Sequence, residues 1–409
     1  MTLAAAAHLR DDAAQGELSR MTTLSRRARA TETPPIPAAR AWAARYDGRA
    51  GPALDMTQAV PGYPPPPELL ARLAEAAGSP ASAGYGPIAG DMPLREALAA
   101  DISAFYGAPV AASQVAISAG CNLAFAMAMQ VLAAEGEAVL LPTPWYFNHR
   151  MAMTMQGVRA VPVPARPEDG FVPDPDRIAA LIAEHRPRAV VLVTPNNPTG
   201  AIYPAEVIHA VAELCRKNGC FLVLDETYRD FLPADRVPPH GLFADPGWGD
   251  VLVHLYSFSK AYCVPGHRAG ALAAGPAVMT ELEKAFDTFQ ICPPRPVQQA
   301  LTWAIPALGA WRDGNRALMA RRAAFFRDAV SQLPGWRLDA IGTYFAYLRL
   351  PGSAPEAMRA AEILAAEQGL MTLPGPFFGP GQDRHIRIAF ANAAEDVLGQ
   401  VPARLATFA

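Results

Sequence analysis

The chain has 409 residues, of which 51% are hydrophobic and 18% charged, and its formal net charge is −3. This length allows two or three domains with a large core, and the composition is that of an ordinary globular protein. No basic stripe runs along the chain, so we expect neither nucleic acid nor an anionic membrane surface as a partner.

Residues 1–37 are rich in Ala and Arg and end in "TETPPIP". Asp11, Asp12 and Glu17 argue against an organelle transit peptide, and no continuous apolar segment indicates a secretion signal. We therefore predict a flexible or packed N-terminal extension on a cytoplasmic protein. The five cysteines are scattered along the chain. This fits a reducing compartment and predicts neither a disulfide framework nor a metal site.

Short apolar runs then alternate with segments of helical pattern. The uncharged stretch from Val110 to Ala134 contains polar residues and a glycine, so we interpret it as core and expect no membrane span. Helices are predicted at 122–134 and 204–218. The alternation indicates βαβ units and a mainly parallel sheet flanked by helices, which is an α/β fold. The predicted strands lie at 115–118, 137–141, 159–163, 188–194, 220–226, 251–258 and 270–275.

After Pro296 the pattern changes to helices with a few strands, which predicts a second, smaller α+β domain. The Pro-rich stretch at 58–70 is expected to be an extended connection. We predict that 75–297 form the large domain and that 38–74 and 298–409 together form the small one. The expected elements of the C-terminal part are helices at 297–307, 315–332 and 355–368 and strands at 344–350 and 384–390.

Four polar clusters follow predicted strands. In open α/β sheets, ligands bind beyond the carboxyl ends of the strands. These clusters should therefore meet at one edge of the sheet. They are "SAGCN" (118–122), "TPNNPTG" (194–200), "DETY" (225–228) and "SFSK" (257–260).

The residue types at this edge suggest a ligand. Asp225 ends an apolar strand, and a buried carboxylate is costly unless a cation, such as a protonated ring nitrogen, is paired with it. Lys260 follows an apolar run, and a buried lysine can carry a carbonyl compound as a Schiff base. Ser257, Arg268 and the backbone amides of 120–122 at a helix start suit a phosphate. An aldehyde, a pyridine nitrogen and a phosphate together describe pyridoxal 5'-phosphate.

These motifs identify a family. The chain resembles the class I/II aminotransferases, pyridoxal-phosphate enzymes of the type I fold, from about Asp55 to Phe390. Each motif alone is a weaker signal, since "NNPTG" by itself is a good turn. Together they are highly specific: "NNPTG" (196–200), "DETY" (225–228), "SFSKAYCVPGHR" (257–268) and "HIRIAF" (385–390).

The resemblance implies roles for the residues at the reacting end of the cofactor. Lys260 matches the lysine that carries the cofactor as a Schiff base and later moves the substrate proton. Asp225 matches the residue that keeps the pyridine nitrogen protonated. Asn197 and Tyr228 match the pair that hydrogen-bonds the cofactor's phenolic oxygen. Outside this context, Asp225 with Tyr228 would be read as the start of a turn.

Other matches concern the phosphate and the ring. Ser257 and Arg268 match the phosphate-binding residues, and Ser259 is also expected to bind the cofactor. Tyr146 occupies the position that stacks on the ring, with Trp145 as the alternative. The turn beside the phosphate would be supplied by Gly120, Cys121 and Asn122.

The resemblance also implies which residues contact the substrate and the partner subunit. Arg387 matches the arginine that grips the substrate carboxylate as a bidentate fork, with Asn197 beside it. Ala59 stands near this carboxylate, where many relatives have glycine. Tyr85 resembles the tyrosine that reaches the phosphate of the neighbouring subunit, so we expect a homodimer with shared sites. The alternatives are a structural ion pair for Arg387 and packed aromatics for Tyr85 and Tyr146.

We therefore predict an aminotransferase that moves an amino group between an L-amino acid and a 2-oxo acid by a ping-pong mechanism. The alternative is a lyase, cyclase or decarboxylase on the same scaffold. A non-catalytic sensor would need a DNA-binding domain, and residues 1–37 have no helix-turn-helix pattern.

The sequence does not name the substrate. Specificity for its side chain should depend on residues 58–63, on Asn148 and His149, and on "FDTFQICPPRP" (286–296). His267 stands where the family commonly has a large apolar residue. In the 286–296 segment, the candidates for reading a charged substrate are Asp287 and Arg295.

Overall fold

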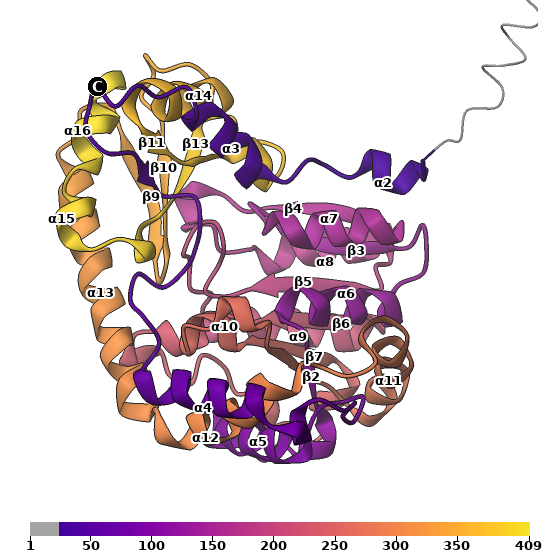
Figure 1. Ribbon diagram of the computed structural model, residues 1–409. Coiled ribbons are helices and arrows are strands. Elements are labelled where there is room, and N and C mark those ends of the chain that lie inside the picture. Colours follow the sequence, from indigo (N-terminus) through magenta and orange to yellow (C-terminus); the bar gives the residue numbers. More distant parts are fainter. Residues whose placement is uncertain (1–23) are drawn as a thin grey trace, which may run out of the picture.

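A seven-stranded sheet forms the centre of the computed structural model, which describes residues 24–409 (Figure 1). Its order is β2-β8-β7-β6-β5-β3-β4, and β8 alone runs antiparallel to its neighbours. All seven strands predicted for this part of the chain are confirmed. They are β2 (Val115–Ser118), β3 (Ala138–Thr143), β4 (Arg159–Pro164), β5 (Ala189–Val193), β6 (Phe221–Asp225), β7 (Leu252–Ser257) and β8 (Gly270–Ala273).

Helices cover both faces of this sheet, which explains why its strands are continuously apolar. Alternate side chains of β5, such as Val190 and Val191, enter two different hydrophobic clusters. One face is covered by α6 (Cys121–Leu132), α7 (Phe147–Gln156) and α11 (Pro276–Gln290). The other is covered by α4 (Pro67–Gly78), α5 (Met92–Tyr106), α8 (Pro175–His185), α9 (Ala205–Asn218) and α12 (Arg295–Ala307).

The C-terminal part adds a smaller layer with its own core. Helix α13 (Gly309–Ser331) runs along one side of the molecule from α12 to this layer (Figure 1). An antiparallel sheet there has the order β12-β13-β10-β9. The other elements are β9 (Arg337–Gly342), β10 (Phe345–Arg349), α14 (Ala357–Gln368), β11 (Leu370–Met371), β12 (Leu373–Pro374), β13 (His385–Ala389), α15 (Glu395–Leu398) and α16 (Val401–Leu405).

The N-terminal part of the described chain joins this smaller layer. β1 (Leu54–Asp55) pairs in parallel with β11, and α3 (Pro35–Ala43) packs on α14. Residues 1–23 of the predicted extension lie outside the described residues, and the rest contains α2 (Arg26–Ala30), whose Arg27 pairs with Glu135.

The predicted domain boundaries stay a prediction. Both α4 and α12 pack into the core under the central sheet. Across residues 24–409, every helix is too short or too polar to cross a membrane.

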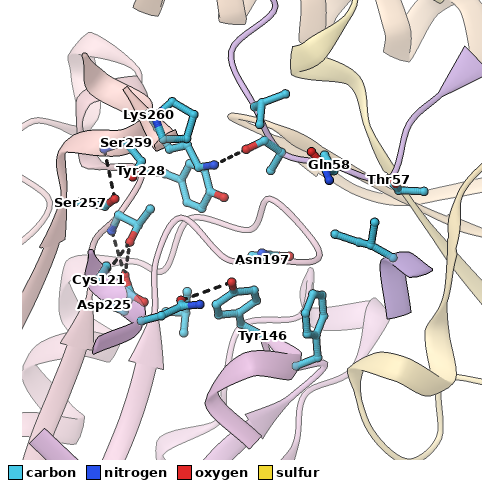
Figure 2. Close-up of a pocket in the computed structure, with 18 of the residues that line it drawn as sticks. Thr57, Gln58, Cys121, Tyr146, Asn197, Asp225, Tyr228, Ser257, Ser259 and Lys260 are labelled. Atoms are coloured by element: carbon cyan, nitrogen blue, oxygen red, sulfur yellow. Dashed lines mark hydrogen bonds between the residues drawn. The ribbon is translucent and has the colours of Figure 1, made fainter. Parts of the chain in front are cut away.

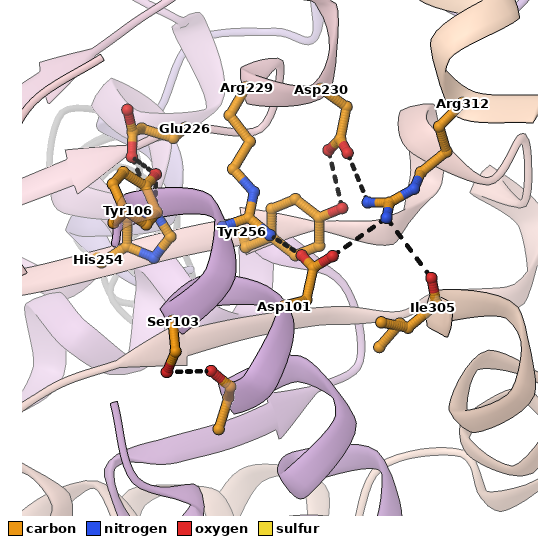
Figure 3. Close-up of polar contacts among 11 residues, drawn as sticks. Asp101, Ser103, Tyr106, Glu226, Arg229, Asp230, His254, Tyr256, Ile305 and Arg312 are labelled. Carbon is orange, nitrogen blue, oxygen red and sulfur yellow. Dashed lines mark hydrogen bonds and ion pairs between the residues drawn. The ribbon is translucent and has the colours of Figure 1, made fainter. Parts of the chain in front are cut away.

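A buried ionic network fastens α13 to the loop after β6 (Figure 3). Arg229 is fully buried, its Nη2 pairs with Asp101 of α5, and its guanidinium lies 4.2 Å from the ring centroid of Tyr256. Arg312 of α13 lies 2.9 Å from Asp230 Oδ1 and 3.1 Å from Asp101 Oδ1. The loop that follows Asp225 is therefore held from two sides by charges that water does not screen.

Asp101→Ala should destabilise the fold strongly, because it leaves the buried Arg229 without its carboxylate. We expect the free energy of unfolding to fall by about 3–5 kcal/mol, measured by denaturant titration. Glu281→Ala is the control, because it removes only an exposed pair with Lys284 and should cost less than about 1 kcal/mol. Equal losses in the two variants would contradict a structural role for the network.

Candidate active site

A cavity of about 240 Å³ lies at the carboxyl edge of the central sheet, where β6 and β7 end (Figure 2). Arg387 of β13 also lines it. Asp225, Cys121 and Ser257 lie at one end of it, and Thr57 and Gln58 lie at the other. Most of the residues predicted for the site line this cavity. They are Ala59, Cys121, Asn122, Tyr146, Asn197, Asp225, Tyr228, Ser257, Ser259, Lys260, Arg268 and Arg387.

Asp225 is a buried carboxylate with three donors around it. Its Oδ1 accepts hydrogen bonds from Thr227 N at 2.9 Å and Thr227 Oγ1 at 2.7 Å, and its Oδ2 lies 3.2 Å from His149 Nε2. Burial alone would raise the pKa of Asp225. The hydrogen bond and charge of His149, with the bonds from Thr227, outweigh burial and bring the pKa below its usual value. The cavity therefore has a fixed negative charge at this end.

His149 is not where we expected it. We predicted that it would contact the substrate side chain, but it is only 1% exposed and stacks on Phe125, with 3.8 Å between the ring centroids. Its ring lies behind that of Tyr146, with 5.1 Å between the two ring centroids, because residues three apart on a helix share a face. Asn148 also lies off the cavity lining and donates to Tyr146 Oη at 2.9 Å. His149 thus supports Asp225 instead.

The sequence reasoning also missed Thr227, although a signal for it was present. In "DETY" it stands two residues after Asp225, which is the spacing at which an Asp side chain bonds to the backbone of its own turn. No comparable local pattern indicates His149, because its contact with Asp225 joins residues distant in the chain.

Lys260 has an amine that loses its proton easily. Its Nζ donates a hydrogen bond to the carbonyl of Ala59 (Figure 2). Burial, together with the positive charges of Arg268 and Arg387, lowers the pKa of Lys260 to about 8. A substantial fraction of the amine is therefore neutral and nucleophilic near physiological pH.

Arg387 is a buried cation with donor capacity to spare. It is 2% exposed, and its guanidinium lies 5.0 Å from the ring centroid of Phe345 and 5.1 Å from that of Phe378. Nη1 donates to Asn197 Oδ1 at 2.9 Å and Nη2 to the carbonyl of Thr57. Among the described residues, Nε has no hydrogen-bond partner. Such a guanidinium suits a carboxylate.

Two glycines allow Arg268 to reach the start of α6. A Cβ on Gly120, whose φ is +92°, would lie 2.1 Å from Arg268 Nη2, and a Cβ on Gly270 would lie 2.4 Å from Cys121 N. Gly120 was predicted as part of this turn, and Gly270 was missed. The first N–H groups of α6 have no partner within the helix. Together with Arg268 they make an anion site.

Of the remaining aromatic residues predicted for the site, Tyr146 lines the cavity, whereas Trp145 and Tyr85 do not. Tyr146 lines the cavity and donates to Asn122 Oδ1 at 3.4 Å, whereas its alternative, Trp145, is 7% exposed and packs in the core. Tyr85 is 82% exposed and does not line the cavity of its own chain. Its predicted contact with a second subunit stays a prediction.

Comparison with known proteins decides the family. The family model for aminotransferase class I and II matches residues 53–405. The chain belongs to this family. It is 28% identical to the aromatic aminotransferase ISS1 of Arabidopsis thaliana over 93% of this chain and 95% of that protein. It is 31% identical to the arginine–pyruvate transaminase AruH of Pseudomonas aeruginosa over 76% of this chain and 79% of that one.

A solved relative has the same architecture. The aspartate aminotransferase of Thermus thermophilus with maleate superposes with a TM-score of 0.86 at 26% identity, covering 95% of this chain and all of that one. Class I/II aminotransferases depend on pyridoxal phosphate, and so does this one. The predicted family, type I fold, enzyme class and cofactor are therefore confirmed.

The donor set of the cavity fits this cofactor. Asp225 offers a charged carboxylate for a ring nitrogen, and Lys260 offers an amine for an aldehyde. Arg268 and the start of α6 offer an anion site for the phosphate. The guanidinium of Arg387, which lines the cavity, remains for the carboxylate of a substrate.

The depressed pKa of Lys260 has a measurable consequence. In the cofactor-free protein, the rate of competitive acetylation of Lys260 should rise with pH and level off above about 8, because only the neutral amine reacts. A free lysine amine would show this transition near about 10.4. Peptide mass spectrometry separates Lys260 from the exposed Lys217 and Lys284. A midpoint at the free-lysine value would contradict the assigned environment.

Proposed function

We propose that transamination between an L-amino acid and a 2-oxo acid takes place in this cavity by a ping-pong mechanism. The observation that carries the proposal is the meeting of a readily deprotonated lysine, a buried carboxylate and a buried arginine in one cavity. When bound, pyridoxal phosphate supplies an aldehyde for amines and a ring that accepts electrons. The other tasks fall to side chains of this chain.

Lys260 is proposed as both the attachment point and the base. Its Nζ would take the proton from the substrate Cα and pass it to the cofactor carbon that carries the aldehyde. Asp225 remains ionised and holds a ring proton, with His149 and Thr227 keeping the carboxylate charged. Burial raises the pKa of Tyr228 well above its usual value, so its hydroxyl keeps its proton and can donate a hydrogen bond together with Asn197.

Binding and orientation are assigned to the rest of the cavity. Arg387, with Asn197 beside it, holds the substrate carboxylate, and Ala59 lies next to this position. Tyr146, which lines the cavity, would stack on the cofactor ring. The phosphate is proposed to bind to the N–H groups of Cys121 and Asn122 and to the side chains of Ser257, Ser259 and Arg268. The N–H of Gly120 already donates to Ser118 O at 2.7 Å, so Gly120 contributes by leaving room for Arg268.

A homodimer is the proposed assembly, because Tyr85 is 82% exposed and lies outside its own cavity. In a two-fold dimer the same tyrosine would complete the partner's phosphate site. Mixing Lys260→Ala chains with Tyr85→Ala chains should then restore activity, since a heterodimer has one site with both lesions and one with neither. Activity no higher than that of the separate variants would contradict shared sites.

A cytoplasmic location is also proposed, consistent with five free cysteines.

One half of the ping-pong cycle, run with an amino acid and no oxo acid, tests transamination directly. With cofactor loaded and an amino acid as the only substrate, each chain should release about one equivalent of oxo acid and then stop. Adding a 2-oxo acid should restart the release. Lys260→Ala is the control and should release none.

A different product would favour the alternative function. Continuous formation of ammonia, carbon dioxide or a cyclised product without any acceptor would identify a lyase, decarboxylase or cyclase and overturn the proposal.

A further inference from the structure

The part of the cavity that no proposed role claims is uncharged. The charged residues among the described residues lining it are Asp225, Lys260, Arg268 and Arg387, and each has a task above. What remains for a substrate side chain is mainly apolar, with one amide and one hydroxyl. These remaining residues are Ile36, Thr57, Gln58, Val60, Phe147, Val193 and Pro265.

The backbone of residues 57–60 locates this region relative to the substrate. The carbonyl of Thr57 accepts from Arg387, and the carbonyl of Ala59 accepts from Lys260. This segment therefore spans the distance between the carboxylate grip and the base. A substrate held by Arg387 with its Cα near Lys260 lies against this segment, and Gln58 and Val60 line the cavity there.

An apolar wall continues beside Arg387. Phe378 lies 5.1 Å from the guanidinium, and the ring centroid of Phe147 lies 6.0 Å from that of Phe378. Ile36, from the first turn of α3, lines the cavity and packs against the same cluster. A second charge on the substrate would thus lose water without gaining a partner from this chain, whereas an apolar side chain would bury hydrocarbon on hydrocarbon.

The two residues predicted to read a charged substrate do not line the cavity of their own chain. Arg295 Nη1 donates to the carbonyl of Ala81 at 2.6 Å, and its Nε lies 3.4 Å from Asp91 Oδ1. Asp287 is exposed on α11. Asp287 and Arg295 are both absent from the lining of their own chain's cavity, and Arg295 is already bonded to Ala81 and Asp91.

We infer that the amino donor has an apolar, uncharged side chain, and that Ile36 and Val60 determine this preference. The inference rests on the proposed transamination, which provides the amino donor. It goes further by naming the class of side chain and the residues that select it.

The test is the donor half-reaction of the cofactor-loaded enzyme, followed with leucine, phenylalanine, aspartate and lysine and with no acceptor present. The rate constant per donor concentration should be at least about tenfold higher for leucine and phenylalanine than for aspartate and lysine. A faster or equal reaction with aspartate or lysine would overturn the inference and leave transamination intact. No reaction with any donor would instead refute the proposed function.

Two substitutions test whether Ile36 and Val60 select the substrate side chain. Ile36→Ala and Val60→Ala should each lower the ratio of the leucine rate to the alanine rate by about tenfold, because hydrocarbon that packs on the longer side chain is removed. Leu24→Ala is the matched control, since Leu24 is 74% exposed and lies off the cavity. An unchanged cofactor absorption spectrum shows that each variant is folded. Ratios equal to that of Leu24→Ala would refute the assignment.

Discussion

The structure of the site depends on one buried carboxylate that stays charged. Asp225 ends a strand in the middle of the central sheet, where an unpaired charge would cost several kcal/mol. His149 and Thr227 offset this cost with hydrogen bonds on both carboxylate oxygens. The loop that follows is anchored away from the cavity by Asp230 and Arg229, so the position of Asp225 does not depend on a single contact.

Residues 225–229 include side chains that line the cavity and side chains that support it from behind. Asp225, Thr227 and Tyr228 line the cavity, while Glu226 and Arg229 point into the protein. Glu226 Oε2 lies 2.9 Å from His254 Nε2 and 3.3 Å from His240 Nε2 (Figure 3 shows the contact with His254). Side chains with different functions are thus neighbours in sequence at the end of β6 and in the turn that follows it. The ion pairs of Glu226 and Arg229 hold in place the backbone that carries the cavity-lining Asp225, Thr227 and Tyr228.

Much of this could be predicted from the sequence because the signals are local. Continuous apolar runs specify a sheet buried on both faces, and polar clusters at the ends of such runs specify where they meet. β9 was not predicted, because its residues are exposed or half-buried and show no clear alternation. α13 begins at Gly309, earlier than the predicted residue 315, because glycine and charged residues in its first turns hide the helical pattern.

The missed parts of the site share a physical cause. His149 reaches Asp225 across the sheet, and Gly270 matters only because a neighbouring turn packs against it. Such contacts join residues far apart in the chain, so no spacing records them. Ile36 is a similar case, since it enters the cavity from an N-terminal helix. The motifs identify the chemistry, and the folded chain is needed to find what surrounds it.

The central claim is that this cavity, and no other part of the chain, binds the cofactor through Lys260. The lysines of the chain are Lys217, Lys260 and Lys284. Borohydride reduction of the cofactor-loaded protein, followed by peptide mapping, should place the cofactor label on Lys260 alone. The label on Lys217 or Lys284, or no label on a protein that retains the cofactor, would contradict the account.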